Sequence, residues 1–420
     1  MRFQTLADWL TWLETLHPRT VDLGLTRIQT VFASLELVKP APYVITVAGT
    51  NGKGSCVALL EAILLAGGHR VGCYTSPHLL KFNERIKING QAVTDAALCE
   101  IFAHIDSKRA EISLTYFEFV TLAALYLFHQ QALEIVILEV GMGGRLDAVN
   151  IIDTDLAIIS GIDFDHMDYL GSTRDAIGFE KAGIMRAGKP TIYGGEAIPN
   201  SILRHAEQLG VPLYYKGRDY DYQLNSTTWH WQTATQQLTN LPLPTLPIQN
   251  AATVLQAHQL LAAHLQISQN LIKDCLVHTR LMGRYQRLST VNGASLIVDV
   301  AHNPQSCRLL AQRLQTETCL GKTYGLVAML ADKDIKNSLE PLLPVIEHWF
   351  LADLTVSRGG SAELLKKYLI QLDCTHYQSF ETVAIAYEQL INQVTPHDRI
   401  IVFGSFHTVG DVLALHDDKK

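Results

Sequence analysis

The run TVAGTNGKGS at residues 46–55 combines glycines, a lysine and hydroxyl side chains in a spacing that suits phosphate binding. Glycines let the backbone approach a phosphate closely, and the N-terminus of a following helix adds partial positive charge. We expect Lys53 to reach the β- and γ-phosphates of ATP and the Ser55 hydroxyl to contact Mg²⁺. The residues expected to hold the phosphates are Gly49, Thr50, Asn51, Gly52, Lys53, Gly54 and Ser55.

The spacing of this run departs from the usual phosphate-loop pattern, G-x-x-x-x-G-K-[ST]. Gly49 lies only three residues before Gly52. Gly54 separates Lys53 from the hydroxyl residue Ser55. The alternative is a tight turn that needs glycine for steric reasons only. The apolar strand pattern before the run and the helical pattern after it favour the phosphate loop.

Glu139 lies near the carboxyl end of an apolar strand pattern, and His166 follows another such pattern, as the glycine-rich run does. Groups at the carboxyl ends of such strands are where α/β folds bind ligands. The Glu139 carboxylate is a hard oxygen donor that suits Mg²⁺, whereas imidazole on Mg²⁺ is unusual. The alternatives are a charged residue that closes a strand and a structural histidine, since the chain has 17 histidines. From spacing alone, Glu180 and Lys181 indicate a solvated helix face.

Strand patterns alternate with helical patterns along the chain, which indicates an α/β fold with doubly wound sheets. Continuous apolar runs of this length are typical of parallel strands that are covered on both faces. Strands are expected at Tyr43–Ala48, Ile135–Val140, Leu156–Gly161, Leu296–Ala301, Tyr324–Leu330 and Arg399–Gly404. Helices are expected over Gly54–Ala66 and Glu118–Gln130. The glycine-rich run, Glu139 and His166 therefore lie at or beyond the carboxyl ends of predicted strands.

A Thr-, Gln- and Pro-rich stretch, Thr227–Pro247, interrupts this alternation and indicates a hairpin or a loop excursion. The alternation resumes only after His278–Gln286. We therefore place a domain boundary near residues 284–290. This boundary predicts a first domain of residues 1–285 and a second of residues 286–420, both of ordinary domain size.

The composition is that of a globular chain, with 420 residues, 48% hydrophobic and 18% charged. The net charge of −7 offers no basic footprint for nucleic acid. Seven cysteines without a CxxC pair argue against disulfide frameworks and zinc sites and favour a reducing compartment. The N-terminus lacks the features of a signal peptide, and the longest apolar stretch is too short to span a bilayer. We therefore expect a cytoplasmic protein with no nucleic-acid or membrane partner.

Motifs spread in order over nearly the whole chain resemble the folylpolyglutamate synthase family of the Mur ligase superfamily, specifically its bacterial bifunctional dihydrofolate synthase/folylpolyglutamate synthases. Each motif alone is weak evidence, but together they are highly specific. They are Asp22–Leu25, Gly49–Ser55, Thr75–Leu79, Leu114–Glu118, Leu138–Ala148, Asp165–His166, Glu180–Ile184, Gln249–Ala252, Gly283–Arg284, Asp299–Pro304 and Gly404–Val409. The resemblance implies a phosphate-loop central domain of Mur ligase type, with a mostly parallel sheet, and a smaller Rossmann-like C-terminal α/β domain.

The resemblance implies roles that spacing alone leaves open. Lys181 resembles a lysine that becomes a carbamate in this family, and it is expected to act in catalysis with Lys53 and His166. Carbon dioxide on a neutral amine makes an anionic oxygen ligand for Mg²⁺, and nearby metal charge would favour that neutral amine. The residues that match Mg²⁺ ligands are Ser55, Ser76, Glu139 and His166. Those that match nucleotide contacts, besides the phosphate loop, are Asn250, Arg284 and Asp299.

Substrate contacts are implied by the resemblance in the same way. The residues that match pterin contacts are Pro18, Arg19, Thr20, Val21, Thr115, Tyr116, Phe117, Glu118, Leu146, Asp147 and Ala148. His302, Ser405 and His407 lie where the family receives the incoming glutamate. Two departures from the family pattern occur. Cys56 follows Ser55 where threonines are common, and Met282 precedes Gly283 where proline is usual.

The implied activity is an ATP- and Mg²⁺-dependent ligation of L-glutamate to dihydropteroate, giving dihydrofolate, and to tetrahydrofolate glutamates, giving polyglutamates, through an acyl phosphate. The alternatives are folylpolyglutamate synthase activity alone and another Mur-type amino-acid ligase, against which the pterin-type N-terminal segment argues. A nucleotide-hydrolysing switch protein is disfavoured because the sequence contains no NKxD motif. A catalytically dead scaffold is disfavoured because the candidate residues are intact, namely Lys53, Ser76, Glu139, His166 and Lys181. The resemblance implies a monomer.

Overall fold

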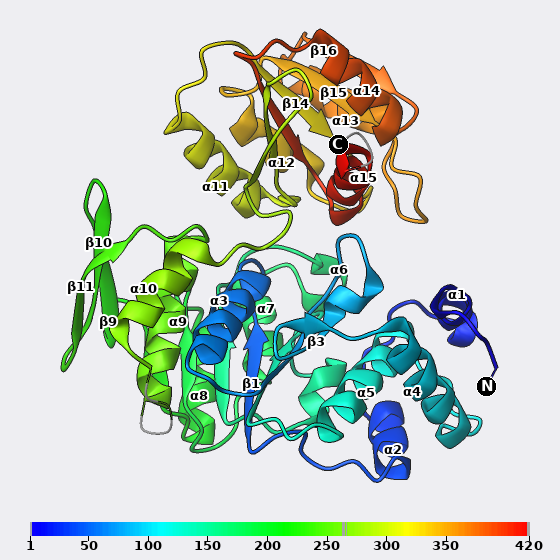
Figure 1. Cartoon of the computed structure of the whole chain (residues 1–420), viewed down its shortest axis with the longest axis vertical. Helices are drawn as coiled ribbons and strands as arrows, with labels where there is room; N and C mark the ends of the chain where they lie inside the picture. Colours follow the sequence, from blue (N-terminus) through cyan, green and yellow to red (C-terminus); the bar gives the residue numbers. More distant parts are fainter. Residues whose placement is uncertain (1, 263–264, 266, 418–420) are drawn as a thin grey trace. The chain divides into compact units, whose positions relative to one another are not determined.

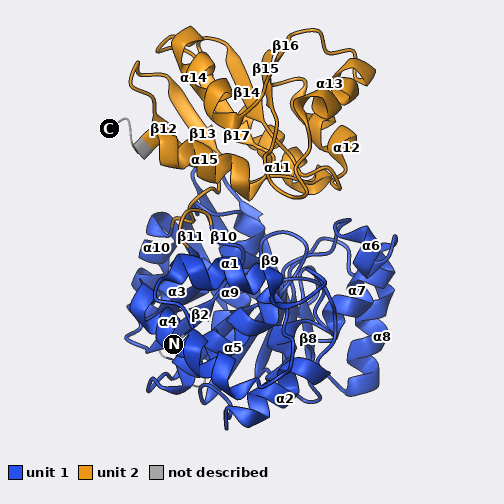
Figure 2. Cartoon of the chain, turned by 90° about the vertical axis from the view of Figure 1, so that its right-hand side faces the viewer, with its two compact units in different colours: residues 1–78, 82–279 blue, residues 79–81, 280–420 orange. Residues whose placement is uncertain are grey.

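A computed structural model describes residues 2–262, 265 and 267–417 and divides the chain into two units (Figure 2). The first unit comprises residues 1–78 and 82–279, and the second comprises residues 79–81 and 280–420. The short segment Leu79–Lys81 therefore belongs to the second unit although its neighbours on both sides belong to the first.

The first unit is built on a mixed, mostly parallel sheet with the strand order β4-β3-β2-β5-β1-β6-β7-β8. The strands from β2 to β8 in this order pair in parallel, whereas β3 and β4 are antiparallel additions at one edge. The strands are β1 (Tyr43–Ala48), β2 (Val71–Tyr74), β3 (Ile86–Ile88), β4 (Gln91–Ala92), β5 (Ile135–Glu139), β6 (Leu156–Ile159), β7 (Thr191–Tyr193) and β8 (Leu213–Tyr215).

Helices cover this sheet, as the continuous apolar strands require. Figure 1 shows α9 and α10 beside α3, and α5 beside α4, in agreement with their contacts. The α-helices are α1 (Leu6–Leu16), α2 (Thr26–Ser34), α3 (Lys53–Ala66), α4 (Asp95–Lys108), α5 (Tyr116–His129), α6 (Met167–Leu170), α7 (Arg174–Ala182), α8 (Asn200–Leu209), α9 (Ile248–Leu261) and α10 (Gln269–His278). Two short 3₁₀ helices, η1 (Phe82–Arg85) and η2 (Ala148–Ile151), connect elements in the same unit.

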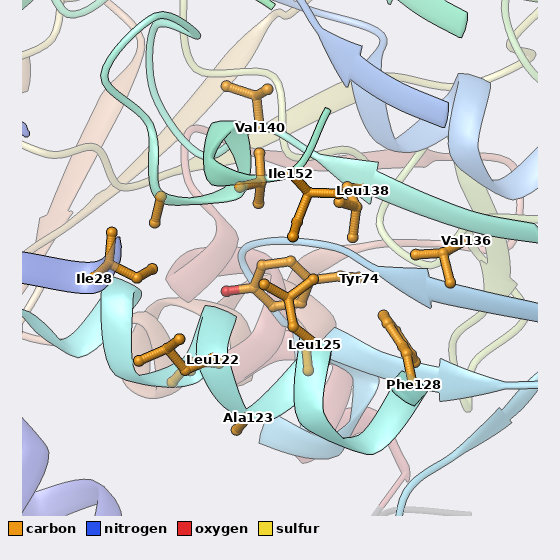
Figure 3. Packing of buried hydrophobic residues seen from close by; sticks show 14 of the residues in the cluster. Ile28, Tyr74, Leu122, Ala123, Leu125, Phe128, Val136, Leu138, Val140 and Ile152 are labelled. Atoms are coloured by element: carbon orange, nitrogen blue, oxygen red, sulfur yellow. The ribbon is translucent and has the colours of Figure 1, made fainter. Parts of the chain in front are cut away.

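A hydrophobic core of the first unit includes side chains from the sheet and from α5. Figure 3 shows the Tyr74 ring from β2 among Leu122 and Leu125 from α5 and Leu138 from β5. Each of these side chains is at most 1% exposed to solvent. The helix begins with a capping box, in which Thr115 and Glu118 satisfy each other's backbone N–H groups. Apolar burial on the helix and this cap together hold α5 against the strands that carry the candidate residues.

Truncating a residue of this core tests that arrangement. We expect Leu125→Ala to lower the free energy of unfolding by about 2–5 kcal/mol, because the methyl groups lost leave a cavity that close-packed neighbours fill only in part. Urea denaturation followed by tryptophan fluorescence measures the change. The matched control is Leu320→Ala, because that leucine is 83% exposed and its loss should change stability by less than about 0.5 kcal/mol. Equal effects of the two substitutions would contradict the packing described.

The predicted strands begin within one residue of the observed strands, and all but one of them extend beyond the observed ends. The predicted strand Tyr43–Ala48 is confirmed as β1, and Ile135–Val140 is one residue longer than β5. The predicted Leu156–Gly161 ends early, at Ile159. Residues 160 and 161 leave the sheet because their polar groups bond to the loop after β1. Hydrogen bonds to the loop after β1 therefore end β6 earlier than its apolar character predicts.

The Thr227–Pro247 stretch, predicted to be a hairpin or a loop, is confirmed as a hairpin within a three-stranded antiparallel sheet. Its strands are β9 (Tyr220–Leu224), β10 (Thr228–Thr233) and β11 (Gln237–Pro242). The indole of Trp231 donates to the Ala252 carbonyl of α9 at 3.1 Å, which fastens the hairpin to a helix of the first unit. The first strand of this sheet, β9, was not predicted, because polar residues alternate along it and it contains no continuous apolar run.

The second unit is a smaller α/β domain whose sheet has the order β12-β13-β17-β14-β15-β16. Only β12 pairs in the antiparallel sense. Its elements in the described residues are β12 (Gln286–Ser289), β13 (Ser295–Val298), α11 (Pro304–Gln315), β14 (Thr323–Val327), α12 (Ile335–Leu339), η3 (Glu340–Leu342), β15 (His348–Ala352), α13 (Ala362–Gln371), β16 (Tyr377–Phe380), α14 (Val383–Gln393), β17 (Arg399–Phe403) and α15 (Phe406–Asp417). Separate hydrophobic cores pack on its two faces. The α/β fold class predicted from the sequence is thus confirmed.

No helix among the described residues has both the length and the apolar character needed to cross a membrane.

Candidate active site

Four segments with candidate residues leave the carboxyl ends of neighbouring strands in the first unit. Strands β2, β5, β1 and β6 lie side by side in that order. Ser76 follows β2, Glu139 ends β5, the glycine-rich loop follows β1, and His166 lies beyond β6. The pairing register sets Val47 opposite Glu139, which brings the loop entrance beside that carboxylate. This edge is where open parallel sheets bind ligands.

Two glycines give the loop after β1 its shape. Gly49 has φ +149°, and a Cβ at this position would lie 1.9 Å from the Ser160 Oγ. Gly52 has φ +88° and directly precedes α3, and its Cβ would lie 2.6 Å from the Asn250 Oδ1. A larger residue at either position would therefore collide with a neighbour or strain the backbone. The same contacts place Asn250 against the phosphate loop.

The loop is also held by hydrogen bonds from the neighbouring strand. Ser160 Oγ donates to the Asn51 carbonyl at 2.7 Å. Thr50 N donates to the Gly161 carbonyl at 2.9 Å, and Thr50 Oγ1 donates to the Asp163 carbonyl at 3.0 Å. These bonds fix the loop before any nucleotide arrives. Ser160 was not singled out in the sequence, because a serine after an apolar run carries no signal without the sheet order.

Two lysine ammonium groups meet at one oxygen in this loop. Lys53 Nζ donates to the Gly49 carbonyl at 3.1 Å, and Lys181 Nζ donates to the same carbonyl at 2.9 Å. Lys181 is only 4% exposed. Burial and, to a smaller extent, the positive charge of Lys53 lower the pKa of Lys181 to about 7. The sequence interpretation of Lys181 as part of a solvated helix face is therefore wrong, because tertiary packing encloses it.

The buried lysine is positioned by the glycine-rich segment after β5. Arg145 N donates to the Glu180 carbonyl at 2.7 Å, and the Arg145 guanidinium pairs with the Glu180 carboxylate at 2.8 Å. A Cβ on Gly144 would lie 2.8 Å from the Glu180 carbonyl oxygen. The close approach of this segment to α7 requires glycine and fixes the side chain that follows, Lys181.

Oxygen donors lie along the same edge. The Glu139 carboxylate is 4% exposed and accepts from Ser76 N at 3.4 Å. Ser55, in the first turn of α3, is 3% exposed. His166 has φ +52°, and its Nε2 lies 3.8 Å from Asp165 Oδ2. A carboxylate with nearby hydroxyls is chemistry that Mg²⁺ accepts.

Within residues 2–262, 265 and 267–417, no group of three or more His, Cys, Asp or Glu side chains has the arrangement of a closed metal site. Mg²⁺ commonly keeps several waters and takes one or two carboxylates together with substrate phosphates. The four predicted ligands, Ser55, Ser76, Glu139 and His166, contain one carboxylate. They fit an open Mg²⁺ site that phosphate oxygens complete, and they do not fit a dedicated protein cage.

The segments predicted to contact a pterin converge around α2, α5 and η2, which pack on one another. Glu118 accepts from Thr115 N at 2.8 Å and from the Arg27 guanidinium at 3.2 Å. Arg27 also donates to Asp22 Oδ2 at 2.6 Å. These bonds tie the segment after Pro18–Val21 to the start of α5. The structure thus gives the Glu118 carboxylate a structural role at the helix N-terminus.

Phe117 and Asp147 line the loop after β5. A Cβ on Gly141 would lie 2.7 Å from the Phe117 ring, and that ring is 5.9 Å from the Tyr74 ring. Asp147 accepts from Met142 N at 2.8 Å and from Val149 N at 3.1 Å. Burial raises the pKa of Asp147 to about 6, although these backbone donors and Lys53 oppose the rise. Leu146 and Ala148 flank this carboxylate in the same loop.

In the second unit, the predicted nucleotide contacts Arg284 and Asp299 are close to each other. Asp299 accepts from Tyr285 N and from Ala301 N, both at 2.8 Å. Burial raises the pKa of Asp299 above its ordinary value, and the positive charge of Arg284 partly offsets the rise. This turn ends β13 at Val298, three residues before the predicted end at Ala301.

The predicted glutamate-receiving residues are partly brought together in the same unit. His302 lies 6.4 Å from the Phe406 ring, and the Arg284 guanidinium lies 4.9 Å from that ring. Ser405 is buried and its hydroxyl bonds Thr408 Oγ1 at 2.7 Å, whereas His407 is exposed. Phe406 belongs to the matching motif Gly404–Val409 but was not singled out as a candidate residue. Its place directly between Ser405 and His407 was the available signal.

Two family models match the chain. The Mur ligase middle domain matches residues 47–194. The Mur ligase, glutamate ligase domain matches residues 283–406. Together these matches cover most of the loops described in both units.

The chain is also similar to known proteins along its whole length. It is 44% identical over 415 residues to the dihydrofolate synthase/folylpolyglutamate synthase of Escherichia coli strain K12, covering 99% of this chain and 96% of that protein. Its structure resembles E. coli FolC in complex with DHPP and ADP, with a TM-score of 0.94, 44% identity and coverage of 99% and 98%. It also resembles a bifunctional folylpolyglutamate synthase/dihydrofolate synthase with Mn, AMPPNP and L-glutamate bound, with a TM-score of 0.91, 46% identity and coverage of 98% for both chains.

Proposed function

The chain belongs to the bifunctional dihydrofolate synthase/folylpolyglutamate synthase family of Mur ligases, and from this premise we propose that it uses ATP and Mg²⁺ to join L-glutamate to dihydropteroate and to tetrahydrofolate glutamates. The first reaction gives dihydrofolate and the second gives polyglutamates. Support comes from the similar structures, whose ligands are ADP and DHPP in one case and Mn, AMPPNP and L-glutamate in the other.

One observation carries this proposal. The ammonium groups of Lys53 and Lys181 both donate to the Gly49 carbonyl, at 3.1 and 2.9 Å, in the loop beside Glu139. Two cations held this close need an anion to neutralise them. A triphosphate above the loop would supply that anion and would draw the Lys53 ammonium away from the carbonyl toward its γ-phosphate.

The first step forms an acyl phosphate. A carboxylate oxygen of the folate substrate attacks the γ-phosphorus, the bond to the β,γ-bridging oxygen breaks, and ADP leaves with the electron pair. Lys53 stabilises the negative charge that develops on the transferring group, and the backbone N–H groups of the glycine loop hold the remaining phosphates. When bound, Mg²⁺ supplies further charge neutralisation. Ser55, Ser76, Glu139 and His166 are the residues that would hold it.

The second step forms the amide bond. The amine of the incoming glutamate attacks the acyl carbon, a proton leaves the nitrogen, and the tetrahedral intermediate collapses with release of inorganic phosphate. We propose that His302, Ser405 and His407 of the second unit receive this glutamate, and that Arg284 and Asp299 contact the nucleotide with Asn250. Water must be kept from the acyl phosphate, since hydrolysis would waste the ATP.

Lys181 is proposed to carry a carbamate. Its nitrogen would attack dissolved carbon dioxide, a new N–C bond would form, and one proton would pass to solvent. The reaction needs a neutral amine, and burial beside Lys53 lowers the pKa of Lys181 to about 7, so that a large fraction is neutral at physiological pH. The carbamate would replace a buried cation next to Lys53 by an anion that can pair with it or ligate the metal.

A coupled assay tests the proposed function. Phosphate release is measured with ATP, Mg²⁺ and L-glutamate, and dihydropteroate, tetrahydrofolate or a muramyl peptide is added in turn. We expect release with both dihydropteroate and tetrahydrofolate, together with the glutamylated products detected by mass spectrometry. Release with tetrahydrofolate alone would indicate folylpolyglutamate synthase activity only. Release with the muramyl peptide, or without any acceptor, would overturn the proposal in favour of another ligase or a hydrolase.

A further inference from the structure

A buried arginine in the first unit has no carboxylate partner. Arg85, the last residue of η1, is 9% exposed. Its Nε donates to His78 Nδ1 at 2.8 Å, so His78 is neutral at that nitrogen. Among the described residues, no Asp or Glu oxygen lies within ion-pair distance of the Arg85 guanidinium. Burying a charge without a counter-charge costs free energy, so a buried arginine of this kind commonly binds an anion.

Two other arginines of the protein, Arg399 and Arg27, make more hydrogen bonds through their guanidinium groups. Arg399, 8% exposed, donates to the Thr323 hydroxyl and to two backbone carbonyls. Arg27 contacts the carboxylates of both Asp22 and Glu118. Arginine presents five N–H donors, and Arg85 uses one of them on a neutral ring. Its terminal guanidinium nitrogens are not sealed from solvent, and they remain available to a ligand.

The surroundings of Arg85 are aromatic and lie between two parts of the candidate site. Its guanidinium carbon is 5.7 Å from the ring centres of both Phe82 and Tyr116. Tyr116 begins α5 in the segment predicted to contact the pterin. On the other side, Thr75 N donates to the Arg85 carbonyl at 2.8 Å, directly before Ser76. The guanidinium therefore lies beside the predicted pterin contact Tyr116, and the Arg85 backbone is bonded to the residue that precedes the predicted metal ligand Ser76.

Dihydropteroate and tetrahydrofolate glutamates differ in the number of carboxylates near the reacting group. Dihydropteroate ends in a single carboxylate, which is the group that reacts. A tetrahydrofolate glutamate carries a reacting γ-carboxylate and, a few bonds away, an α-carboxylate that does not react. When the γ-carboxylate is at the γ-phosphate, the α-carboxylate must be held nearby as a second anion. Planar guanidinium groups bind carboxylates through two parallel hydrogen bonds.

We propose that Arg85 binds the α-carboxylate of the terminal glutamate of folate substrates, and so determines the use of folates without serving dihydropteroate. The inference rests on the proposed function. It assigns one residue to one of the two activities, with Phe82 and Tyr116 holding the guanidinium plane in place. His78 orients the Arg85 guanidinium by accepting a hydrogen bond from Arg85 Nε.

The test compares substrates in one variant. In Arg85→Gln, we expect the KM for tetrahydrofolate to rise about 10- to 100-fold, as for the loss of charged hydrogen bonds, while the KM for dihydropteroate changes less than about threefold. Arg85→Lys keeps the positive charge but lacks the forked pair of N–H donors. Its KM for tetrahydrofolate should therefore lie between those of the wild type and Arg85→Gln. Activity with dihydropteroate serves as the internal check that the variant is folded. The matched control is Arg109→Gln, since Arg109 is also largely buried but pairs with Asp106 at 2.8 Å, and it should show no substrate selectivity.

A substrate analogue gives a second readout. A tetrahydropteroyl compound that carries 4-aminobutyrate in place of glutamate keeps a reacting carboxylate and lacks the α-carboxylate. The wild-type protein should use it about 10- to 100-fold less well than tetrahydrofolate, and Arg85→Gln should use the two almost equally. Equal losses with dihydropteroate and tetrahydrofolate, or a raised KM for L-glutamate instead, would overturn the proposal. A wild-type protein without ligase activity on either substrate would instead refute the proposed function.

Discussion

Lys53→Met lowers kcat/KM for both ligations by about 10²- to 10³-fold, the expected loss when one preorganised charge at a transferring phosphoryl group is removed. In the structure, Lys53 Nζ already sits in the loop, at 3.1 Å from the Gly49 carbonyl. Methionine preserves the length of the side chain and the apolar stem, so the loop should keep its shape. Phosphate release with saturating glutamate measures the effect, and calorimetric binding of ADP separates nucleotide affinity from chemistry.

The control for this substitution is Lys366→Met. Lys366 forms an exposed i,i+3 pair with Glu363 at 3.1 Å, and such pairs contribute about 1 kcal/mol or less to stability. Its loss should leave kcat/KM within twofold of wild type. If Lys53→Met kept more than one-tenth of the wild-type activity, the assignment of Lys53 to the transferring phosphate would be wrong.

Lys181→Ala is expected to reduce activity by about 100-fold or more, because both the proposed carbamate oxygens and the group that orients Gly49 are lost. The substitution leaves a buried space, since the side chain is 4% exposed. Formate or acetate could enter that space and supply the missing anionic oxygens. We expect 50–100 mM of such a small carboxylate, roughly the concentration that fills a weak site, to restore part of kcat.

The pH dependence of the wild-type protein gives an independent measure of the same group. Carbamate formation needs the neutral amine, and Lys181 has a pKa lowered to about 7 by burial and by Lys53. Between pH 6 and pH 8 the neutral fraction rises roughly tenfold. At a fixed concentration of dissolved carbon dioxide, activity should therefore rise through this range. Adding bicarbonate should raise activity most at low pH, where the neutral amine is scarce.

Lys189→Ala serves as the matched control for Lys181. Lys189 lies in the same unit, but its side chain is 48% exposed and pairs with Asp155 at 3.0 Å. Its loss should leave activity unchanged with or without formate. Two results together would contradict the carbamate: formate fails to rescue Lys181→Ala, and the activity of the wild-type protein does not depend on carbon dioxide. Lys181 would then act as a cation that orients the loop.

Local residue patterns were enough to predict several helices, strands and loops. The glycine-rich run after an apolar strand predicted both the loop after β1 and the helix α3, because backbone conformation at Gly49 and Gly52 is a local property. Apolar runs predicted six buried strands but not the buried β2, β7 and β15. The helical pattern at Glu118–Gln130 predicted α5 to within two residues at its start. The resemblance to a family then supplied the substrate class that no spacing could give.

Other features depended on which strands become neighbours. The spacing of Glu180 and Lys181 indicated a solvated helix face, yet the loop after β5 packs on α7 and buries Lys181. Ser160 supports the phosphate loop only because β6 pairs with β1. The assignment of Leu79–Lys81 to the second unit also has no counterpart in any local pattern.

By itself, then, the sequence determined the strand-loop-helix at residues 43–66, the α/β class and the residue types available for phosphate and metal chemistry. Each of these follows from local backbone preference or from apolar periodicity. Only the tertiary structure decided that Lys53 and Lys181 share one carbonyl oxygen and that Arg85 is buried without an acid. The physical reason is that burial and charge pairing, which set a group's protonation and affinity, are properties of segments brought together from distant parts of the chain.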